Sequence, residues 1–327
     1  MTLIISFLLT LQLFAGLPAR LFLYILFSVH IDKRGSIAYN VLVLDTYTNW
    51  EGDAVATSVK DIIRRRKSVR TYSGEALHSE DKQKLDEFLK TLDNPLGVPV
   101  EFRFLDAKEY ALSSPVIVGT DEYVAAKVSR VPQSEIAYGY SFEAFCLFAE
   151  SLGIGTVMLA ATLSRNAFER AMEVKDTEVM PVASPIGYLA DKQSVREKLM
   201  RKGIKADERL PFDMLFFENS FAHGLIPEHA GQFRDALEMA RLAPSAGNKQ
   251  PWRAVVCGDK VHFYEKKAKA MSNNPLGDIQ KVDVGIALAH FDLTLKESGI
   301  SGDFAVDDPG FATDNSIEYI VTYEVKH

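Results

Sequence analysis

Basic side chains crowd one short stretch of the sequence, RRRKSVR at residues 64–70. Arg66, Lys67 and Arg70 offer several N–H donors there, and Ser68 adds a hydroxyl group. Convergent cationic donors together with a hydroxyl suit the binding of a phosphate monoester dianion. Basic residues at the end of a helix also offset the helix dipole while they face water. The stretch by itself therefore leaves two interpretations open, a phosphate site and a solvated helix end.

A second stretch, APSAGNKQPWR at residues 243–253, combines small, polar and conformationally special residues. Pro244 ends the preceding helix, and Ser245 and Gly247 allow close approach of a ligand to the backbone, with a positive φ permitted at Gly247. Asn248 brings an amide that both donates and accepts hydrogen bonds. Such a loop can border a flat polar ring. It can also be a plain connection whose polar groups satisfy the local backbone.

The composition excludes several classes of protein. A net charge of −7 and a pI near 5.6 argue against a general nucleic-acid binder. Two cysteines, Cys146 and Cys257, cannot form a disulfide scaffold, so we expect buried thiols in a reducing, cytoplasmic compartment. The histidines show no HxxxH or HExxH spacing, and we predict no metal site. No GxGxxG segment follows a strand, and no nucleophilic triad is evident.

Residues 1–54 differ from the rest because two apolar runs dominate them. A membrane anchor or hairpin is one interpretation, although Arg20 near the middle of a spanning helix costs about 3 kcal/mol. A signal peptide is another, although no positive charge precedes the apolar run. The third is a leader that is not part of the protein, because the codons for residues 50–52 can contain a ribosome-binding sequence and Val55 can be a GTG start. In each case we expect the fold to begin near Ala56.

From Ala56 onward the spacing of apolar residues predicts alternating helices and strands. In the first part we expect a helix capped by Ser58, a helix capped by Ser79, strands at 101–105 and 115–120, a mostly apolar helix within 138–156, and an extended excursion or linker at 181–219. In the second part we expect a helix at 226–244 with Pro227 in its first turn, two strands around a turn at Gly258 and Asp259, a mostly apolar helix at 282–299 and a strand at 317–325.

The second part repeats the order of elements in the first. KLDEFLKTLDNPLGVPVEFRFL and FRDALEMARLAPSAGNKQPWRAVV keep helix, turn and strand in phase. We therefore predict an α+β fold of two related halves, at residues 55–219 and 220–327, that form a pseudo-dimer around the two apolar helices. The basic stretch has no counterpart in the second half, and PSAGNKQPW has none in the first. Two complementary half-sites predict one composite site per chain.

Together the two motifs, RRRKSVRTY and APSAGNKQPWR, resemble those of the FMN-dependent nitroreductase family. PIGYLADK and ERLP are also similar to the flavin-flanking region of that family. The resemblance runs from about Ala56 to the end of the chain in a rearranged form, since ordinary members carry both motifs near the N-terminus and bind flavin between two subunits. The chain looks like a duplicated, single-chain branch, which implies a nitroreductase-like fold, a monomer that imitates a dimer and one flavin per chain.

The resemblance assigns roles to individual residues. It implies a flavin-phosphate site at Arg66, Lys67, Ser68 and Arg70, completed by Arg209. It implies that Pro244, Ser245, Gly247 and Asn248 border the flavin ring. GIGTVMLA resembles the segment near the reactive face of the ring, which makes Thr156, Val157 and Met158 neighbours of it, with core packing as the alternative for Met158. The sequence shows no match for the asparagine and acidic residue with which the family contacts the ring, so the partners of flavin N5 and O4 are not assigned.

The implied function is an FMN-dependent oxidoreductase that needs no catalytic side chain, because the cofactor performs the redox chemistry. NAD(P)H is the expected hydride donor and a nitroaromatic, a quinone or a similar small molecule the expected acceptor, in a ping-pong cycle. Two alternatives stay open: another flavin chemistry on the same fold, and a flavin- or nucleotide-binding protein without turnover. We expect no nucleic-acid partner, and a membrane association only if residues 3–30 form a genuine anchor.

Overall fold

The chain divides into two compact units, Met1–Thr57 and Ser58–His327. The computed structural model describes residues 4–12, 22–31, 37–46, 57–192, 194–267, 277–312 and 315–326. The predictions on Arg20, on residues 50–52 and on Val55 lie outside these ranges. Within them, no helix combines the length and the apolar character needed to cross a membrane.

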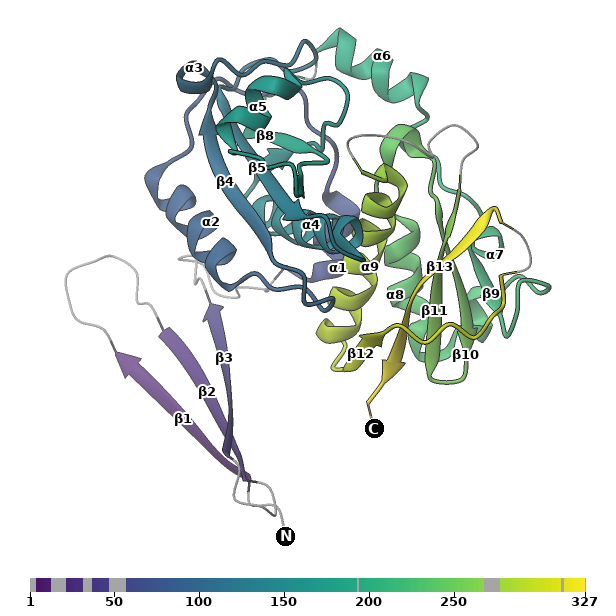
Figure 1. The fold of residues 1–327 in the computed structure, drawn as a ribbon. Coiled ribbons are helices and arrows are strands. Elements are labelled where there is room, and N and C mark those ends of the chain that lie inside the picture. The colour runs from purple at the N-terminus through teal and green to yellow at the C-terminus, as the bar shows by residue number, and fades with distance from the viewer. Residues whose placement is uncertain are drawn as a thin grey trace. The chain divides into compact units, whose positions relative to one another are not determined.

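The first unit contains an antiparallel sheet of three strands, in the order β1-β2-β3 (Figure 1). The strands are β1 (Ile4–Gln12), β2 (Phe22–Ile31) and β3 (Ile37–Thr46). The interpretation of residues 1–54 as anchor, signal or leader stays a prediction.

The second unit begins with a half built on a sheet of order β4-β5-β8-β6, in which every neighbouring pair is antiparallel. Ser58 begins its first helix as predicted, since the Ser58 hydroxyl accepts a hydrogen bond from the backbone N–H of Asp61. The elements are α1 (Val59–Arg65), α2 (Ser79–Thr91), β4 (Val100–Asp106), α3 (Ala107–Tyr110), β5 (Glu122–Ser129), α4 (Ser134–Ser151), β6 (Ile154–Thr156), α5 (Arg165–Ala171), β7 (Glu178–Val179), which pairs with β5, β8 (Ala183–Tyr188) and α6 (Val195–Gly203).

The other half of this unit has a sheet of order β10-β11-β13-β12, again antiparallel throughout, with β9 added parallel to β10. Its elements are α7 (Phe212–Leu215), β9 (Phe216–Glu218), the 3₁₀ turns η1 (Pro227–His229) and η2 (Gly231–Phe233), α8 (Arg234–Arg241), the 3₁₀ turn η3 (Ala246–Asn248), β10 (Trp252–Cys257), β11 (Lys260–Lys266), α9 (Ile279–Glu297), β12 (Gly302–Ala305) and β13 (Ile317–Val325). The two sheets therefore share one strand order, which confirms the predicted fold of two related α+β halves.

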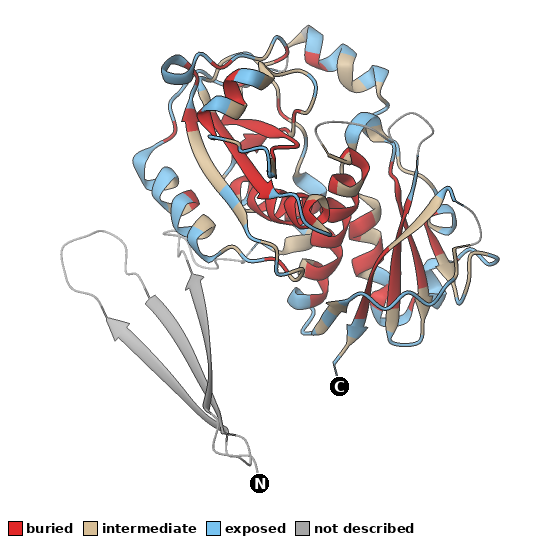
Figure 2. Ribbon diagram, viewed as in Figure 1, coloured by how far each residue is buried: buried red, intermediate tan, exposed pale blue. Residues whose placement is uncertain are grey.

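The helices α4 and α9 pack against each other between the two sheets (Figure 1), and buried residues cover most of both (Figure 2). Their crossing is reciprocal. A Cβ atom at Gly139 would lie 2.0 Å from the carbonyl oxygen of Val282, and one at Gly285 would lie 2.1 Å from that of Ile136. In each helix the glycine lies three residues after the residue whose carbonyl oxygen faces the glycine of the other helix. Gly139 follows Ile136 in this way, and Gly285 follows Val282. Glycine is required at both places because any side chain would push the helices apart.

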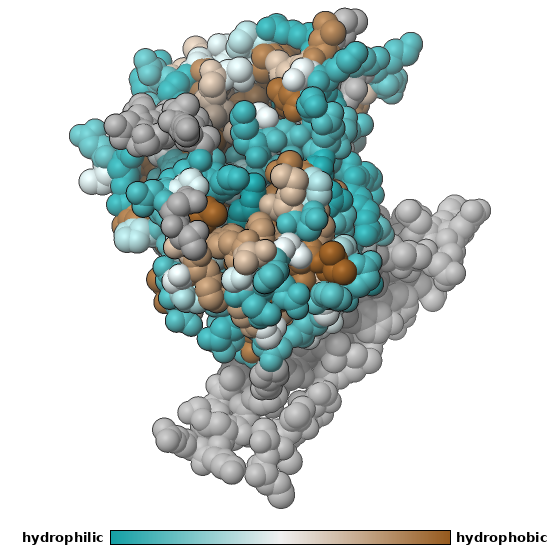
Figure 3. Space-filling view, turned by 90° about the vertical axis from the view of Figure 1, so that its right-hand side faces the viewer, coloured by the Kyte–Doolittle hydropathy of each residue, from teal (hydrophilic) through white to brown (hydrophobic). Residues whose placement is uncertain are grey.

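On the face beyond β9 and β10, hydrophilic residues predominate, and apolar ones lie among them in small groups (Figure 3). Exposed apolar side chains of the described residues, such as Met214 and Ile226, stand singly in the sequence. Such scattered apolar residues are normal on protein surfaces.

Three expectations for the first half are wrong. Ser79 is the first residue of α2 and His78 precedes it as the N-cap, without a side-chain capping bond. Residues 115–120 form no strand, because their backbone makes only an isolated bridge, Thr71 with Val118. The segment 181–219 is no simple linker. Its residues 183–188 form β8, an inner strand between β5 and β6, whose partners supply backbone hydrogen bonds on both edges.

The second half differs from expectation at two places. The helix predicted over 226–244 is three pieces, η1, η2 and α8, because Gly231 adopts a φ of 54°, which an α-helix cannot contain. The strand β9 lies before the expected boundary at residue 219, yet it pairs with β10 through Phe216 and Ala254. The end of the predicted first half therefore belongs to the second sheet.

Candidate functional site

The basic stretch lies where α1 ends and the chain turns extended. Arg66 is the C-cap, with φ −56° and ψ 130°. The following residues run beside β6: Ser68 bridges to Thr156 in parallel, and the backbone N–H of Val69 donates to the Thr156 carbonyl at 2.9 Å. A Cβ at Gly155 would lie 2.9 Å from that of Val69, so only glycine permits this approach. The basic stretch and the segment GIGTVMLA, predicted to lie near the reactive face of the ring, thus form one wall of the candidate site.

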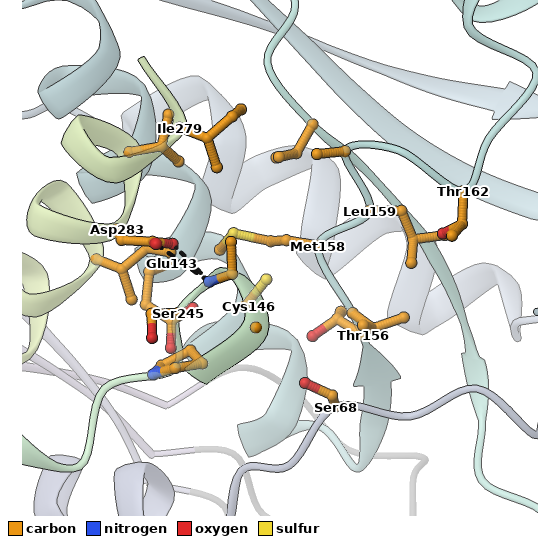
Figure 4. A pocket seen from close by; sticks show the side chains of 18 of the residues that line it. Ser68, Glu143, Cys146, Thr156, Met158, Leu159, Thr162, Ser245, Ile279 and Asp283 are labelled. Carbon is orange, nitrogen blue, oxygen red and sulfur yellow. Dashed lines mark hydrogen bonds between the residues drawn. The ribbon is translucent and has the colours of Figure 1, made fainter. Parts of the chain in front are cut away.

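The loop from the second half forms the opposite wall, and a buried carboxylate holds it. Both oxygens of Asp283, on α9, accept a hydrogen bond from the backbone N–H of Ala246, at 3.0 and 3.1 Å (Figure 4). The Ser245 hydroxyl accepts one from the N–H of Gln250 at 2.9 Å. Gly247 has a φ of 57°, as the sequence predicted it could. Burial raises the pKa of Asp283 well above its usual range, although the bond from Ala246 opposes the shift.

Two adjoining cavities lie between these walls. The first, of about 310 Å³, is mostly apolar and is lined by nine of the predicted residues, namely Arg66, Ser68, Arg70, Thr156, Val157, Met158, Pro244, Ser245 and Gly247. Figure 4 shows its labelled side chains, with Ser68, Thr156 and Met158 facing Ser245 and Asp283 across the space. The second, of about 340 Å³, is strongly basic and is lined by Arg66, Lys67, Ser68, Arg209, Pro244, Ser245 and Asn248. Every predicted site residue therefore lines at least one of the two cavities.

The cavities divide the basic stretch differently from the sequence interpretation. Lys67 lines only the basic cavity, and Arg70 lines only the apolar one. The Nε and Nη1 atoms of Arg70 are buried and have no hydrogen-bond partner among the described residues. Burial lowers the pKa of Arg70, while the charge of Glu197 partly offsets the shift. Arg70 is thus a partly buried cation with two buried donor atoms that make no hydrogen bond in the described part of the chain.

Two predicted residues hold the walls together instead of presenting free groups. The Arg209 guanidinium donates to the carbonyls of Leu242 at 3.0 Å and Ala206 at 2.8 Å. The amide of Asn248 donates to the carbonyls of Lys205 at 2.7 Å and Glu208 at 2.9 Å. Asn248 also lines the basic cavity and not the apolar one, where a ring-bordering residue was expected. These bonds tie the chain around residues 205–209 to the loop of the second half.

Sequence reasoning missed the polar residues that the central helices contribute to the apolar cavity, Glu143 and Cys146 from α4 and Asp283 from α9. Their signal is present: a carboxylate inside a helix that is otherwise apolar all round must be buried and therefore needs a partner. Burial raises the pKa of the Cys146 thiol, with the charge of Glu143 adding to the shift, so this cysteine is no reactive thiolate. In the described part of the chain, no group of three or more histidine, cysteine, aspartate or glutamate residues could hold a metal ion.

Comparison with known proteins gives a family and a fold. The family model described as "Putative TM nitroreductase" matches residues 58–295. A solved structure of a "putative nitroreductase" from Thermotoga maritima is 18% identical, with a TM-score of 0.56 over 85% of this chain and 99% of that one. Among curated proteins, none matches the sequence.

Two further solved structures match smaller shares of the chain. A "Putative NADH dehydrogenase/NAD(P)H nitroreductase" from Bacteroides thetaiotaomicron is 21% identical, with a TM-score of 0.36 over 44% of this chain and 90% of that one. An "FMN-dependent Nitroreductase" from Clostridium difficile is 14% identical, with a TM-score of 0.34 over 43% and 94%.

Proposed function

This chain belongs to the nitroreductase family, whose members are oxidoreductases, and we propose that it is an FMN-dependent NAD(P)H oxidoreductase with one flavin site per chain. The observation that carries the proposal is the pair of adjoining cavities, one mostly apolar and one basic. A planar ring system with a phosphate tail needs both kinds of space side by side. When bound, FMN supplies the transfer of a hydride from NAD(P)H to a nitroaromatic or quinone acceptor in a ping-pong cycle.

The donor set fits a phosphate group in the basic cavity. Arg66, Lys67 and Ser68 all line it. The buried Nε of Arg66 makes no hydrogen bond in the described part of the chain, although it lies 3.3 Å from Oε1 of Glu143 in an ion pair. Three such groups from one extended segment would hold a phosphate dianion. The bonds of Arg209 to backbone carbonyls assign it a different task, which is to fix the rim of this cavity.

The apolar cavity suits the ring. Val157, Met158 and Ile286 present apolar surface to it, and Arg70 brings two donors without partners. We assign Arg70 to the polar edge of the ring and not to the phosphate, because it lines only this cavity. Asp283 acts indirectly, by holding the backbone of Ala246 so that the loop 243–250 borders the ring. No side chain here needs to act as a nucleophile or general base.

Visible absorbance of the purified full-length chain tests the proposal. We expect flavin bands on addition of FMN, bleaching with NADPH under anaerobic conditions, and recovery with a nitroaromatic or quinone. Bands that never bleach would instead indicate a flavin-binding protein without NADPH turnover. Bleaching without recovery by either acceptor would indicate another flavin chemistry. The absence of FMN binding would refute the cofactor assignment.

We also propose that the two halves arose by internal duplication and that the chain acts as a monomer in the cytoplasm. The shared strand order and the reciprocal glycine crossing support the first part. The composite site supports the second, because both walls come from one chain. Sedimentation of the FMN-bound protein tests the monomer, and a dimer with flavin between subunits would contradict it.

A further inference from the structure

A buried chain of three side chains, Arg66, Glu143 and His290, runs from the cavities into the core. The side chain of Arg66 is 8% exposed, and those of Glu143 and His290 are 0% exposed. The Oε1 atom of Glu143 lies 3.3 Å from Nε of Arg66 and 2.8 Å from Nε2 of His290. Charged groups are not buried in this way without a role in stability or binding, because their desolvation is costly.

The hydrogen bonds of His290 define where two protons lie in this group of three side chains. Nδ1 of His290 is 2.9 Å from the carbonyl oxygen of Met239, on α8. A carbonyl only accepts, so Nδ1 carries a proton. The contact between Nε2 and Glu143 then holds one more proton, shared between an imidazole and a carboxylate.

The carboxylate of Glu143 thus lies between the guanidinium of Arg66 and the imidazole of His290. Arg66 is the member that reaches the cavities, since it lines both of them. Another cation is close, because the charge of Arg66 is among the causes that lower the pKa of Arg209, after burial. Without a carboxylate behind it, Arg66 would be repelled from this basic region toward solvent. An anion in the basic cavity would offset the positive charges of Arg66 and Arg209, which line it.

We propose that Glu143 and His290 are positioning residues that hold Arg66 toward the phosphate group of the cofactor. The inference rests on the proposed function. It also links the halves, because His290 and Met239 belong to the second half while Glu143 and Arg66 belong to the first. The second half thereby contributes to phosphate binding although it has no counterpart of the basic stretch.

The test compares FMN with riboflavin, which has the same ring and no phosphate. Dissociation constants are measured from flavin fluorescence for the full-length wild type and for Glu143→Gln, which keeps the shape of the side chain and removes its charge. We expect the constant for FMN to rise about tenfold, as for one weakened hydrogen bond to a charged group. The constant for riboflavin should change less than twofold. A Glu143 that acts only as a structural residue would weaken both alike.

A double-mutant cycle shows whether Glu143 acts through Arg66. Arg66→Met should itself reduce the preference for FMN, and in that background Glu143→Gln should cause no further loss. Glu143→Asp, which keeps the charge, should retain most of the preference. If Glu143→Gln does not fold by circular dichroism, His290→Gln tests the same contact from its far side, and a lowered preference for FMN is again expected.

The outcomes separate this inference from the proposed function. A wild type that binds neither flavin would refute the function. A wild type that binds FMN and riboflavin equally would keep the flavin site and refute a phosphate contact through Arg66. A preference for FMN that survives Glu143→Gln, or additive losses in the cycle, would overturn the positioning role alone.

Discussion

The two ends of the α4–α9 pair occupy corresponding places in the two halves. The two adjoining cavities lie at one of them, which we call the open end, and a smaller cavity of about 200 Å³ beside Asn94 and Ser141 lies near the other, which we call the closed end. Counted from the crossing glycines, Tyr140 corresponds to Ile286 and Cys146 to Asp292. Ile286 and Cys146 line the apolar cavity. At the other end the Tyr140 hydroxyl donates to Asp292, which also pairs with Lys296 at 2.7 Å. Small or apolar residues thus leave room at one end, and a tyrosine bonded to a carboxylate fills the other.

The loops near these two ends are held by different chemical groups. At the open end the loop 243–250 is held from outside, by Asp283 of α9. In the first half the amide of Asn94 donates within its own turn, to the carbonyl of Val98 at 2.8 Å, and also to the Ser141 hydroxyl of α4 at 3.3 Å. Both loops are thus bonded to the central helix of their own half, one through a carboxylate and the other through a neutral amide and hydroxyl.

Alanine substitution at the crossing of α4 and α9 should destabilise the fold equally from either helix. Gly139→Ala and Gly285→Ala each place a Cβ within about 2 Å of a carbonyl oxygen of the other helix. We expect each to lower the free energy of unfolding by about 3 kcal/mol or more, measured in urea, because the helices must separate. Gly203→Ala, at the end of α6 with open space around it, is the matched control. If only one of the two alanine substitutions lowered the free energy of unfolding, the crossing would not be reciprocal.

Cations at the two ends should differ in their effect on the cofactor. Arg66→Met removes a buried donor group from the basic cavity, and we expect the dissociation constant of FMN to rise about 100-fold. Lys296→Met removes the cation of the closed end and should leave that constant unchanged. Titration followed by flavin fluorescence measures both and also gives the stoichiometry, for which we expect one FMN per chain. A stoichiometry of two FMN per chain would contradict the difference between the two ends, since the closed end would then bind flavin as well.

Corresponding strands of the two sheets each carry a buried ionisable side chain, and the two side chains differ in whether they have partners. Lys127, near the end of β5, pairs with Glu178 at 3.2 Å and Glu101 at 3.5 Å. Glu265 occupies the similar position near the end of β11, and neither of its buried carboxylate oxygens has a hydrogen-bond partner among the described residues. The first half thus neutralises its charge with partners. We expect the second half to do so with a proton.

Burial raises the pKa of Glu265 to about 7, with Asp278 and Glu318 adding to the shift and Lys281 and Lys267 opposing it. The folded state therefore holds a proton that the unfolded state releases near pH 4.5. The resulting stability is complete below that pH and is lost as the pH rises to about 7. Glu265→Gln, which mimics the protonated acid, should raise the free energy of unfolding at pH 8 by about 2 kcal/mol and have little effect at pH 4. An equal change at both values would contradict the raised pKa.

The sequence predicts local features of the site better than contacts across it. The segments 64–70 and 243–253 were recognisable because glycine, proline and clustered cations act through their own backbone and charge. The pairing of Glu143 with His290 depends on how two helices far apart in the sequence cross, and no local pattern encodes that register. Tertiary contacts also decided the place of Asn248, whose amide binds backbone carbonyls of residues 205–208.

The inner strand β8 escaped prediction for a related reason. Its sequence, ASPIGY, contains a proline and a glycine, which usually mark turns. Backbone bonds from β5 and β6 nevertheless hold it as a strand, and five of its six residues are buried. Glycine also suits position 187 for packing, since a Cβ there would lie 3.0 Å from the ring of Tyr72. Packing, which a single sequence does not display, overrides the local preference.

The smallest expected effect concerns the closed end itself. Burial raises the pKa of Tyr140, and the charge of Asp292 adds to the shift, so the hydroxyl stays protonated and donates to that carboxylate. Tyr140→Phe removes one hydrogen bond to a charged group whose other partner, Lys296, remains. We expect a loss of about 1 kcal/mol, seen as a fall of about 2–4 °C in Tm, and an unchanged dissociation constant for FMN. Because the substitution leaves the ring in place, the closed end stays filled and only its bond is lost. A weaker affinity for FMN would mean that the two ends are coupled through the helix pair, and that the closed end helps to shape the open one.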